Sequence, residues 1–314
     1  MIIKSQAPTR IGLFGGGCDV NPFASKYGGE TLSLAINLRQ HVTLLTDDDV
    51  WKQPEHNLPL SADPALTYKI LDAYGLNGMH SGISVKSRFD GIMGAGLGSS
   101  GAYGVALVAA LQRYKHNSAF NNIALAAYEI EVNALGWNGG RQDQHTAFDG
   151  GLIHLKIGDD KVEVFIGNQY IDRLAPYLVL MYAGGTRESH KRQPKALTEE
   201  RKQVLMLIKA LVPQAIKMLN DNRIKDMGLL MHESWQLKKQ LSNGVSTPKI
   251  DYAYEHAKKN GALGGKLMGA GGCGYMVFFV EPDKREFFIG KMKEKGIENV
   301  DFSADLNGVE ARIL

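Results

Sequence analysis

The sequence predicts an α+β fold in which strands and helices are interleaved without strict β-α-β alternation. Its 314 residues are 44% hydrophobic, enough to bury the core of one large domain or of two smaller ones. Short segments rich in β-formers lie between long segments with helical periodicity, and in two places one strand follows another directly. This order argues against a doubly wound parallel sheet. A domain boundary is expected between residues 165 and 175.

Helices are predicted from the spacing of apolar residues and from helix-end signals. Segment 102–116 is apolar at nearly every turn and ends in cations, which suit the negative end of a helix dipole. Asn121 or Asn122 is suited to cap a second helix that ends at Gly136. The polar segment 47–63 is expected to be a loop or small hairpin. Further helices are expected over 199–220, 224–241, 250–260 and 284–295, and strands over 2–14, 31–46, 82–89, 150–166 (two segments), 176–183, 275–280 and 309–313.

Composition and charge exclude several functional classes. A net charge of +3 is too small for a nucleic-acid-binding protein on electrostatic grounds. No apolar run is long enough to span a bilayer, and the N-terminus lacks the pattern of a signal peptide. The two cysteines, Cys18 and Cys273, lie far apart in glycine-rich stretches, which argues against a disulfide framework and a zinc site. We expect a cytoplasmic protein that acts on a small molecule, and a homo-oligomer stays open.

Many of the 36 glycines fall in three clusters, at 12–17, 91–104 and 261–274. Clustered glycine indicates close approach of the backbone to a ligand. The middle cluster, M-G-A-G-L-G-S-S-G-A-Y, directly precedes a predicted helix. The first N–H groups of a helix have no backbone partner and lie at the positive end of its dipole, so this loop favours a phosphate. Ser99 and Ser100 add hydroxyls for phosphate or Mg²⁺.

The spacing of the middle cluster excludes two common nucleotide motifs. It lacks the G-x-x-x-x-G-K-[ST] pattern of the Walker loop, and residues 94–98 differ in rhythm from G-x-G-x-x-G. A dinucleotide-binding oxidoreductase is therefore disfavoured. The alternative to a phosphate site is a glycine-rich turn with a serine cap.

Taken together, the three clusters resemble the motifs of the GHMP kinase family. They read A-P-T-R-I-G-L-F-G-G-G-C-D at 7–19, G-A-G-L-G-S-S-G-A at 94–102 and K-L-M-G-A-G-G-C-G at 266–274. The resemblance implies a two-domain architecture, with an N-terminal mixed α/β domain over 1–168 and a C-terminal ferredoxin-like α/β sandwich over 169–314. It also implies a kinase that uses ATP and Mg²⁺. The nucleotide phosphates would then contact Gly94, Ala95, Gly96, Leu97, Gly98, Ser99 and Ser100.

One branch of the family matches in further detail. The stretch L-G-W-N-G-G-R-Q-D-Q-H at 135–145, with segment 14–29, resembles the bacterial D-glycero-D-manno-heptose 7-phosphate kinases, and fucokinase-like domains share part of it. The sequence departs from the family at G-S-S-G-A, where many relatives have G-S-S-A or G-S-S-S, and at Cys18, where threonine is common. The implied reaction is transfer of the γ-phosphoryl of ATP to a hydroxyl, the anomeric one, of heptose 7-phosphate. A kinase of an unphosphorylated sugar such as fucose or galactose, or a non-catalytic ligand sensor, stays as an alternative.

Asp143 and Arg10 are the candidate catalytic residues. Phosphoryl transfer to a hydroxyl needs a group that orients the hydroxyl and accepts its proton, and a carboxylate in a tight polar turn suits this task. The family position favours this role over that of an Asx-turn former. Arg10 would lie beside Asp143 and stabilise charge on the transferring phosphoryl, against the alternative of an arginine on a strand surface.

Glu131 and Ser100 are the candidate Mg²⁺ ligands. At 100° per residue, Glu131 falls at the edge of the apolar face of its helix, whereas Glu129 points nearly opposite. A carboxylate at that edge is costly unless it is paired or binds a metal. Ser100 would complete the protein's share of the shell, with ATP oxygens and water supplying the rest. The alternative for Glu131 is an ion pair with an arginine.

Three sets of residues are candidates for binding the acceptor. Asp19, preceded by Gly16 and Gly17, resembles the sugar-binding aspartate of the galactokinase-like branch, and a carboxylate accepts hydrogen bonds from vicinal hydroxyls. Gly271 and Gly272 belong to a loop that we expect to close over the phosphates or the sugar, with a plain hairpin as the alternative.

The third candidate set is a basic stretch, G-G-T-R-E-S-H-K-R-Q-P-K at 184–195. A substrate that already carries a phosphate would need cations of this kind. We expect Arg187 and one neighbouring cation to bind a sugar phosphate. A solvated basic loop is the alternative.

Overall fold

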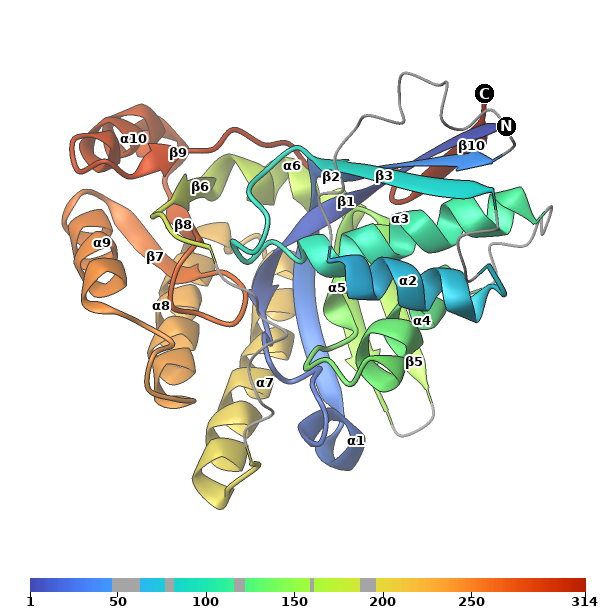
Figure 1. The fold of residues 1–314 in the computed structure, drawn as a ribbon. Helices are drawn as coiled ribbons and strands as arrows, with labels where there is room; N and C mark the ends of the chain where they lie inside the picture. Colours follow the sequence, from blue (N-terminus) through green and yellow to red (C-terminus); the bar gives the residue numbers. More distant parts are fainter. Residues whose placement is uncertain (47–62, 77–81, 116–121, 159–160, 187–195) are drawn as a thin grey trace.

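The computed structural model describes residues 1–46, 63–76, 82–115, 122–158, 161–186 and 196–314, which form two antiparallel sheets and the helices around them (Figure 1). The strands are β1 (Ile2–Phe14), β2 (Gly29–Thr46), β3 (Ile83–Phe89), β4 (Leu152–Ile157), β5 (Val162–Ile166), β6 (Leu178–Tyr182), β7 (Ala262–Leu267), β8 (Tyr275–Val280), β9 (Glu298–Asn299) and β10 (Glu310–Ile313). The main helices are α1 (Phe23–Tyr27), α2 (Pro64–Ala73), α3 (Ser99–Tyr114), α4 (Ile123–Tyr128), α5 (Gln142–Asp149), α6 (Ile171–Leu174), α7 (Glu199–Asn220), α8 (Ile224–Gln240), α9 (Pro248–Lys259) and α10 (Arg285–Lys293). A π-helical segment, η3 (Glu129–Ala134), continues α4.

The larger sheet is built on the long pair β1–β2, which runs through the middle of the molecule (Figure 1). Its strand order is β10-β1-β2-β4-β5, and β3 pairs with the second half of β2. The register of β1 against β2 shifts between Pro8 and Thr9, as expected because proline cannot donate to the ladder. The last strand, β10, lies beside β1, so the two ends of the chain are adjacent (Figure 1).

The helix α3 is the centre of the N-terminal half. Ser99 and every residue from Gly101 to Leu111 are buried. Together with α2, α4 and α5, this helix forms one hydrophobic core against β1 and β2. A helix that is apolar all round belongs in a core, which explains why the segment is apolar at nearly every turn.

The smaller sheet has the order β7-β8-β6-β9. Alternate residues of β6 and β8 face opposite sides: Val179 and Phe278 pack with α9 and α10, whereas Leu180 and Phe279 pack with α7, α8 and the first sheet. The hydrophobic core between the smaller sheet and α7 and α8 therefore also contacts the larger sheet. The two antiparallel sheets with their helices confirm the predicted α+β fold.

Several predicted elements are confirmed closely and a few were wrong or missed. The long helix predicted over 199–220 is α7, and the strand over 2–14 is β1. Segment 142–149, expected to be a tight polar turn around Asp143, is the helix α5. Asn122 precedes α4, but its side chain makes no capping hydrogen bond. The loop expected over 47–63 lies, up to residue 62, outside the described residues, and the division at 168/169 stays a prediction.

Candidate active site

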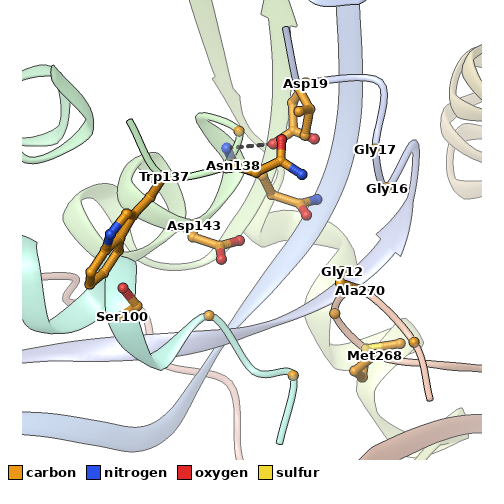
Figure 2. Close-up of a pocket in the computed structure, with 18 of the residues that line it drawn as sticks. Gly12, Gly16, Gly17, Asp19, Ser100, Trp137, Asn138, Asp143, Met268 and Ala270 are labelled. Carbon is orange, nitrogen blue, oxygen red and sulfur yellow. Dashed lines mark hydrogen bonds between the residues drawn. The ribbon is translucent and has the colours of Figure 1, made fainter. Parts of the chain in front are cut away.

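The three glycine clusters meet at one cavity of about 970 Å³ (Figure 2). Its wall includes the end of β1 and the turn after it, the start of α3, the start of α5, and the loop between β7 and β8. Residues at opposite ends of the chain thus face the same space, as the sequence predicted from its glycine-rich loops.

Glycine is required where the phosphate loop (residues 94–100) touches the third glycine loop (residues 268–274). A Cβ on Gly96 would lie 2.9 Å from the carbonyl oxygen of Met268, and one on Gly269 would lie 2.7 Å from the Cα of Gly96. A Cβ on Gly274 would lie 2.2 Å from the carbonyl oxygen of Ala95. Any side chain at these positions would push the two loops apart.

The phosphate loop presents the start of α3 to the cavity. Gly98, in the left-handed region at φ 73°, precedes the helix, and no side chain caps it. The orphan N–H groups of the first turn thus have no side-chain partner from the capping position. Gly94, Gly96, Gly98, Ser99 and Ser100 line the cavity, whereas Ala95 and Leu97 lie in the hydrophobic core. The side chains of Ala95 and Leu97 therefore face the core, and the predicted contact of these two residues with a nucleotide would have to be made by their backbone.

Asp143 lies directly against the phosphate loop and is paired with Arg10. The Nε of Arg10 donates to Oδ1 of Asp143 at 2.8 Å, and the Nη2–Oδ1 distance is 2.7 Å. The third nitrogen of the guanidinium, Nη1, donates to the carbonyl oxygen of Gly96 at 2.7 Å. A Cβ on Gly98 would lie 2.8 Å from the Asp143 carboxylate, so the glycine makes room for it. The contact predicted between Arg10 and Asp143 is therefore present.

Glu131 and Ser100 are also in contact. The hydroxyl of Ser100 donates to Oε1 of Glu131 at 2.5 Å, and the Nε2 of Gln144 donates to Oε2 at 2.8 Å. Glu129 instead accepts a hydrogen bond from Asn133 of its own helix. A carboxylate and a hydroxyl are oxygen ligands of the kind that Mg²⁺ takes. Among the residues that the structure describes, no three His, Cys, Asp or Glu side chains gather to hold a metal.

Burial raises the pKa of Glu131 from 4.5 to about 7, against the opposing effect of its hydrogen bond from Ser100. The folded protein therefore holds this proton over a pH range in which the unfolded chain has released it. Between about pH 4.5 and 7 the unfolded state binds fewer protons at Glu131 than the folded state does. The contribution of Glu131 to the free energy of unfolding therefore falls as pH rises.

We expect thermal unfolding to reveal this contribution. In metal-free protein, the melting temperature of the wild type relative to the Glu131→Gln variant should fall between pH 5 and pH 8, because the variant has no carboxyl to ionise. Scanning calorimetry of both proteins at several pH values measures the difference. A difference that is independent of pH, or that grows in favour of the wild type, would contradict the buried-acid interpretation.

Asp19 is buried in the wall of the cavity (Figure 2). Its Oδ2 accepts the backbone N–H of Gln142, the first residue of α5, at 3.0 Å. Burial raises the pKa of Asp19, and this hydrogen bond lowers it in part. A Cβ on Gly140 would lie 2.0 Å from Oδ2, so the carboxylate occupies space that only glycine leaves open.

Gly140→Ala is expected to displace Asp19 and weaken the binding of the acceptor. The acceptor KM should rise at least about tenfold, because a hydrogen bond to a charged group contributes about 1.5–3 kcal/mol. The KM for the nucleotide should stay near the wild-type value. Gly290→Ala, in α10 with open space around the new methyl group, is the matched control. An unchanged acceptor KM in a folded Gly140→Ala protein would speak against Asp19 as a substrate ligand.

The remaining predicted residues divide into three groups. Gly16, Gly17 and Gly271 line the cavity. Gly272 is not among the residues that line it, and its N–H donates to the carbonyl oxygen of Val245 at 2.8 Å, so a contact between Gly272 and the acceptor stays a prediction. Arg187 and its basic neighbours lie outside the described residues.

Sequence reasoning missed two lysines in the cavity wall. Lys238, on α8, donates to the carbonyl oxygens of Leu267 and Gly269, both at 2.7 Å, and so ties the third glycine loop to that helix. Lys266, at the end of β7, is buried and also lines the cavity. Lys266 stands at the start of the third motif, which is a sequence signal for it, whereas Lys238 has no signal that separates it from an ordinary surface lysine.

Comparisons with known proteins agree with this geometry. The model of the GHMP kinases N terminal domain matches residues 64–151, and that of the GHMP kinases C terminal domain matches residues 211–298. The D-glycero-alpha-D-manno-heptose 7-phosphate kinase of Campylobacter jejuni is 30% identical, over 98% of each chain. A mevalonate kinase of Thermococcus onnurineus is 25% identical, over 91% of each. The chain therefore belongs to the GHMP kinase family.

The enzyme class follows from this membership. The chain is a phosphotransferase with an alcohol group as acceptor, of the small-molecule sugar kinase type. A crystal structure of a D-glycero-D-manno-heptose 1-phosphate kinase from Bacteroides thetaiotaomicron shares the fold, with a TM-score of 0.77, 23% identity and 99% of each chain covered. None of the described helices is both long and apolar enough to cross a membrane.

Proposed function

We propose that this kinase transfers the γ-phosphoryl group of ATP to the anomeric hydroxyl of D-glycero-D-manno-heptose 7-phosphate, with Mg²⁺ as cofactor. The observation that carries the proposal is the meeting of two pairs at one cavity: Arg10 with Asp143, and Ser100 with Glu131. The relative from Campylobacter jejuni, whose name states a heptose 7-phosphate kinase, supports the choice of acceptor.

The phosphate loop and Asp143 have different roles in the reaction: the loop binds the nucleotide, and Asp143 acts on the acceptor hydroxyl. The N–H groups at the start of α3 bind the nucleotide phosphates, because they are unpartnered donors at the positive end of the helix. Asp143 orients the acceptor hydroxyl and accepts its proton as the oxygen attacks phosphorus. Arg10, which spans from Asp143 to the Gly96 carbonyl, stabilises the charge on the transferring group.

Glu131 and Ser100 would hold the metal. Both are oxygen donors in contact at the cavity wall, and the remaining ligands would come from the nucleotide and water. When bound, Mg²⁺ neutralises charge on the phosphate oxygens. The protein's own part is to keep the Glu131 carboxylate oriented by Gln144 and ready to lose its proton.

A kinase assay with ATP and Mg²⁺ across sugars and their phosphates tests the proposal. We expect turnover with heptose 7-phosphate and a new phosphate on the anomeric carbon, identified by NMR of the product. Turnover of fucose or galactose in preference to any sugar phosphate would favour the alternative of an unphosphorylated acceptor. A new phosphate on another carbon would contradict the anomeric assignment.

A further inference from the structure

Lys266 is a buried cation that the reaction described above does not use. The residue is 3% exposed, and its Nζ donates to the carbonyl oxygen of Leu13 at 3.1 Å. An ammonium group carries three protons. In the part of the chain that the structure describes, no carboxylate forms an ion pair with Lys266, although the residue lines the cavity.

A buried charge without a partner is costly. Burial and the charge of Arg10 lower the pKa of Lys266 to about 7, in spite of the opposing effect of Cys18. A binding anion would favour the charged ammonium and supply its missing partner. A negatively charged ligand in the cavity would therefore pair with the ammonium group of Lys266.

The turn after β1 adds further donors beside this lysine. A Cβ on Gly16 would lie 3.8 Å from the Nζ of Lys266, so the glycine and the ammonium face the same region. The turn is closed by the N–H of Cys18, which donates to the carbonyl oxygen of Gly15 at 2.9 Å. Among the described residues, no hydrogen bond uses the N–H of Gly16 or of Gly17. Both glycines line the cavity.

The position of Lys266, Gly16 and Gly17 relative to Asp143 indicates whether they bind an anionic group of the nucleotide or of the acceptor. In Figure 2, Ser100 lies on one side of Asp143, and Gly16 and Gly17 lie on the other. A nucleotide bound at Ser100 therefore leaves the side of Gly16 and Gly17 for the acceptor. An acceptor whose reacting hydroxyl is at Asp143 would extend toward Lys266 with the part of the molecule that does not react.

We propose that Lys266, with the N–H groups of Gly16 and Gly17, binds the terminal phosphate monoester of the acceptor. This inference rests on the proposed function, because it takes the acceptor hydroxyl to lie at Asp143. It assigns the specificity for a phosphorylated acceptor to described residues of β7 and of the turn after β1. It also gives Gly16 and Gly17 a reason to be glycine, since a side chain there would fill the space of the phosphate.

Lys266→Met tests this subsite, because methionine keeps most of the volume of lysine and removes the charge. We expect kcat/KM for heptose 7-phosphate to fall about 50-fold, the size expected for one lost charge-assisted hydrogen bond. For the same heptose without its phosphate, kcat/KM should stay within about threefold of the wild type, and so should the KM for ATP. Lys266→Arg should recover part of the loss. Lys217→Met, which removes an exposed lysine of α7, is the surface control.

Two outcomes would overturn the inference. An equal loss with both heptoses would place Lys266 at the transferring phosphoryl or in the stability of the fold, and thermal unfolding of the variant separates these two. Heptose 7-phosphate binding equally well to wild type and Lys266→Met, measured by calorimetry without nucleotide, would also overturn it. If wild-type protein binds the sugar phosphate through Lys266 but does not turn it over, the proposed function fails and the subsite stands.

Discussion

Asp143→Asn is expected to lower kcat by about 10³-fold, within the range of about 10²- to 10⁴-fold that general-base catalysis contributes. Asparagine keeps the size of the side chain and an oxygen that can accept from Arg10, but it cannot take up the proton of the acceptor hydroxyl. The affinity for ATP should be unchanged, because asparagine can keep the hydrogen bond from Arg10, which also donates to the carbonyl oxygen of Gly96 in the phosphate loop. Steady-state kinetics and nucleotide binding by calorimetry measure the two effects.

Asp149→Asn is the matched control for this variant. Asp149 lies on the same helix, α5, at its other end, and burial raises the pKa of its carboxyl to about 6. Because the site already favours an uncharged group, the amide should be tolerated there. A wild-type kcat in Asp143→Asn, or an equal loss in both variants, would contradict the role of Asp143 as the proton acceptor.

Glu131→Gln is expected to raise the Mg²⁺ concentration for half-maximal activity by at least about 100-fold, since changing even an outer-shell partner of a metal costs about 10- to 100-fold in affinity. The amide keeps the shape but removes the negative charge that the cation needs. Ser100→Ala should shift the same titration in the same direction. Titration of activity with Mg²⁺ at fixed ATP gives the shift.

The neighbouring carboxylate provides the control for the metal ligand. Glu129 is two residues away and accepts a hydrogen bond from Asn133, not from Ser100. Glu129→Gln should therefore leave the Mg²⁺ titration unchanged. If both glutamate variants shift it equally, or if neither does, Glu131 is not the ligand that distinguishes this site.

The fold was predictable where local signals are strong. The helix α7 is amphipathic over 22 residues and begins after Thr198, whose side chain accepts the N–H of Arg201, so both its interior and its start are encoded locally. The strand β7 was missed because it contains Gly264 and Gly265, and glycine is depleted in strands. A Cβ on Gly264 would lie 1.8 Å from the carbonyl oxygen of Gly228 on α8. The strand is thus fixed by tertiary packing, which a local pattern does not contain.

The site was predictable from its motifs more than from its local geometry. Arg10 and Asp143 were placed together by resemblance, and the hydrogen bonds between them confirm the contact. The choice of Glu131 over Glu129 used a rotation of 100° per residue, which does not hold in the π-helical segment η3. The contact between Glu131 and Ser100 is nevertheless present. The burial of Lys266 was not predictable, because it depends on strands far apart in the sequence.

A crystal structure with Mg²⁺ and a non-hydrolysable ATP analogue tests most directly whether the phosphate loop and Asp143 serve one phosphoryl-transfer site. We expect the triphosphate to lie against the N–H groups of residues 96–100. The terminal phosphorus should then leave room for a hydroxyl beside Asp143, about 3–3.5 Å from the reacting phosphorus. A nucleotide bound outside this cavity, or one whose terminal phosphate points away from Asp143, would contradict the assignment.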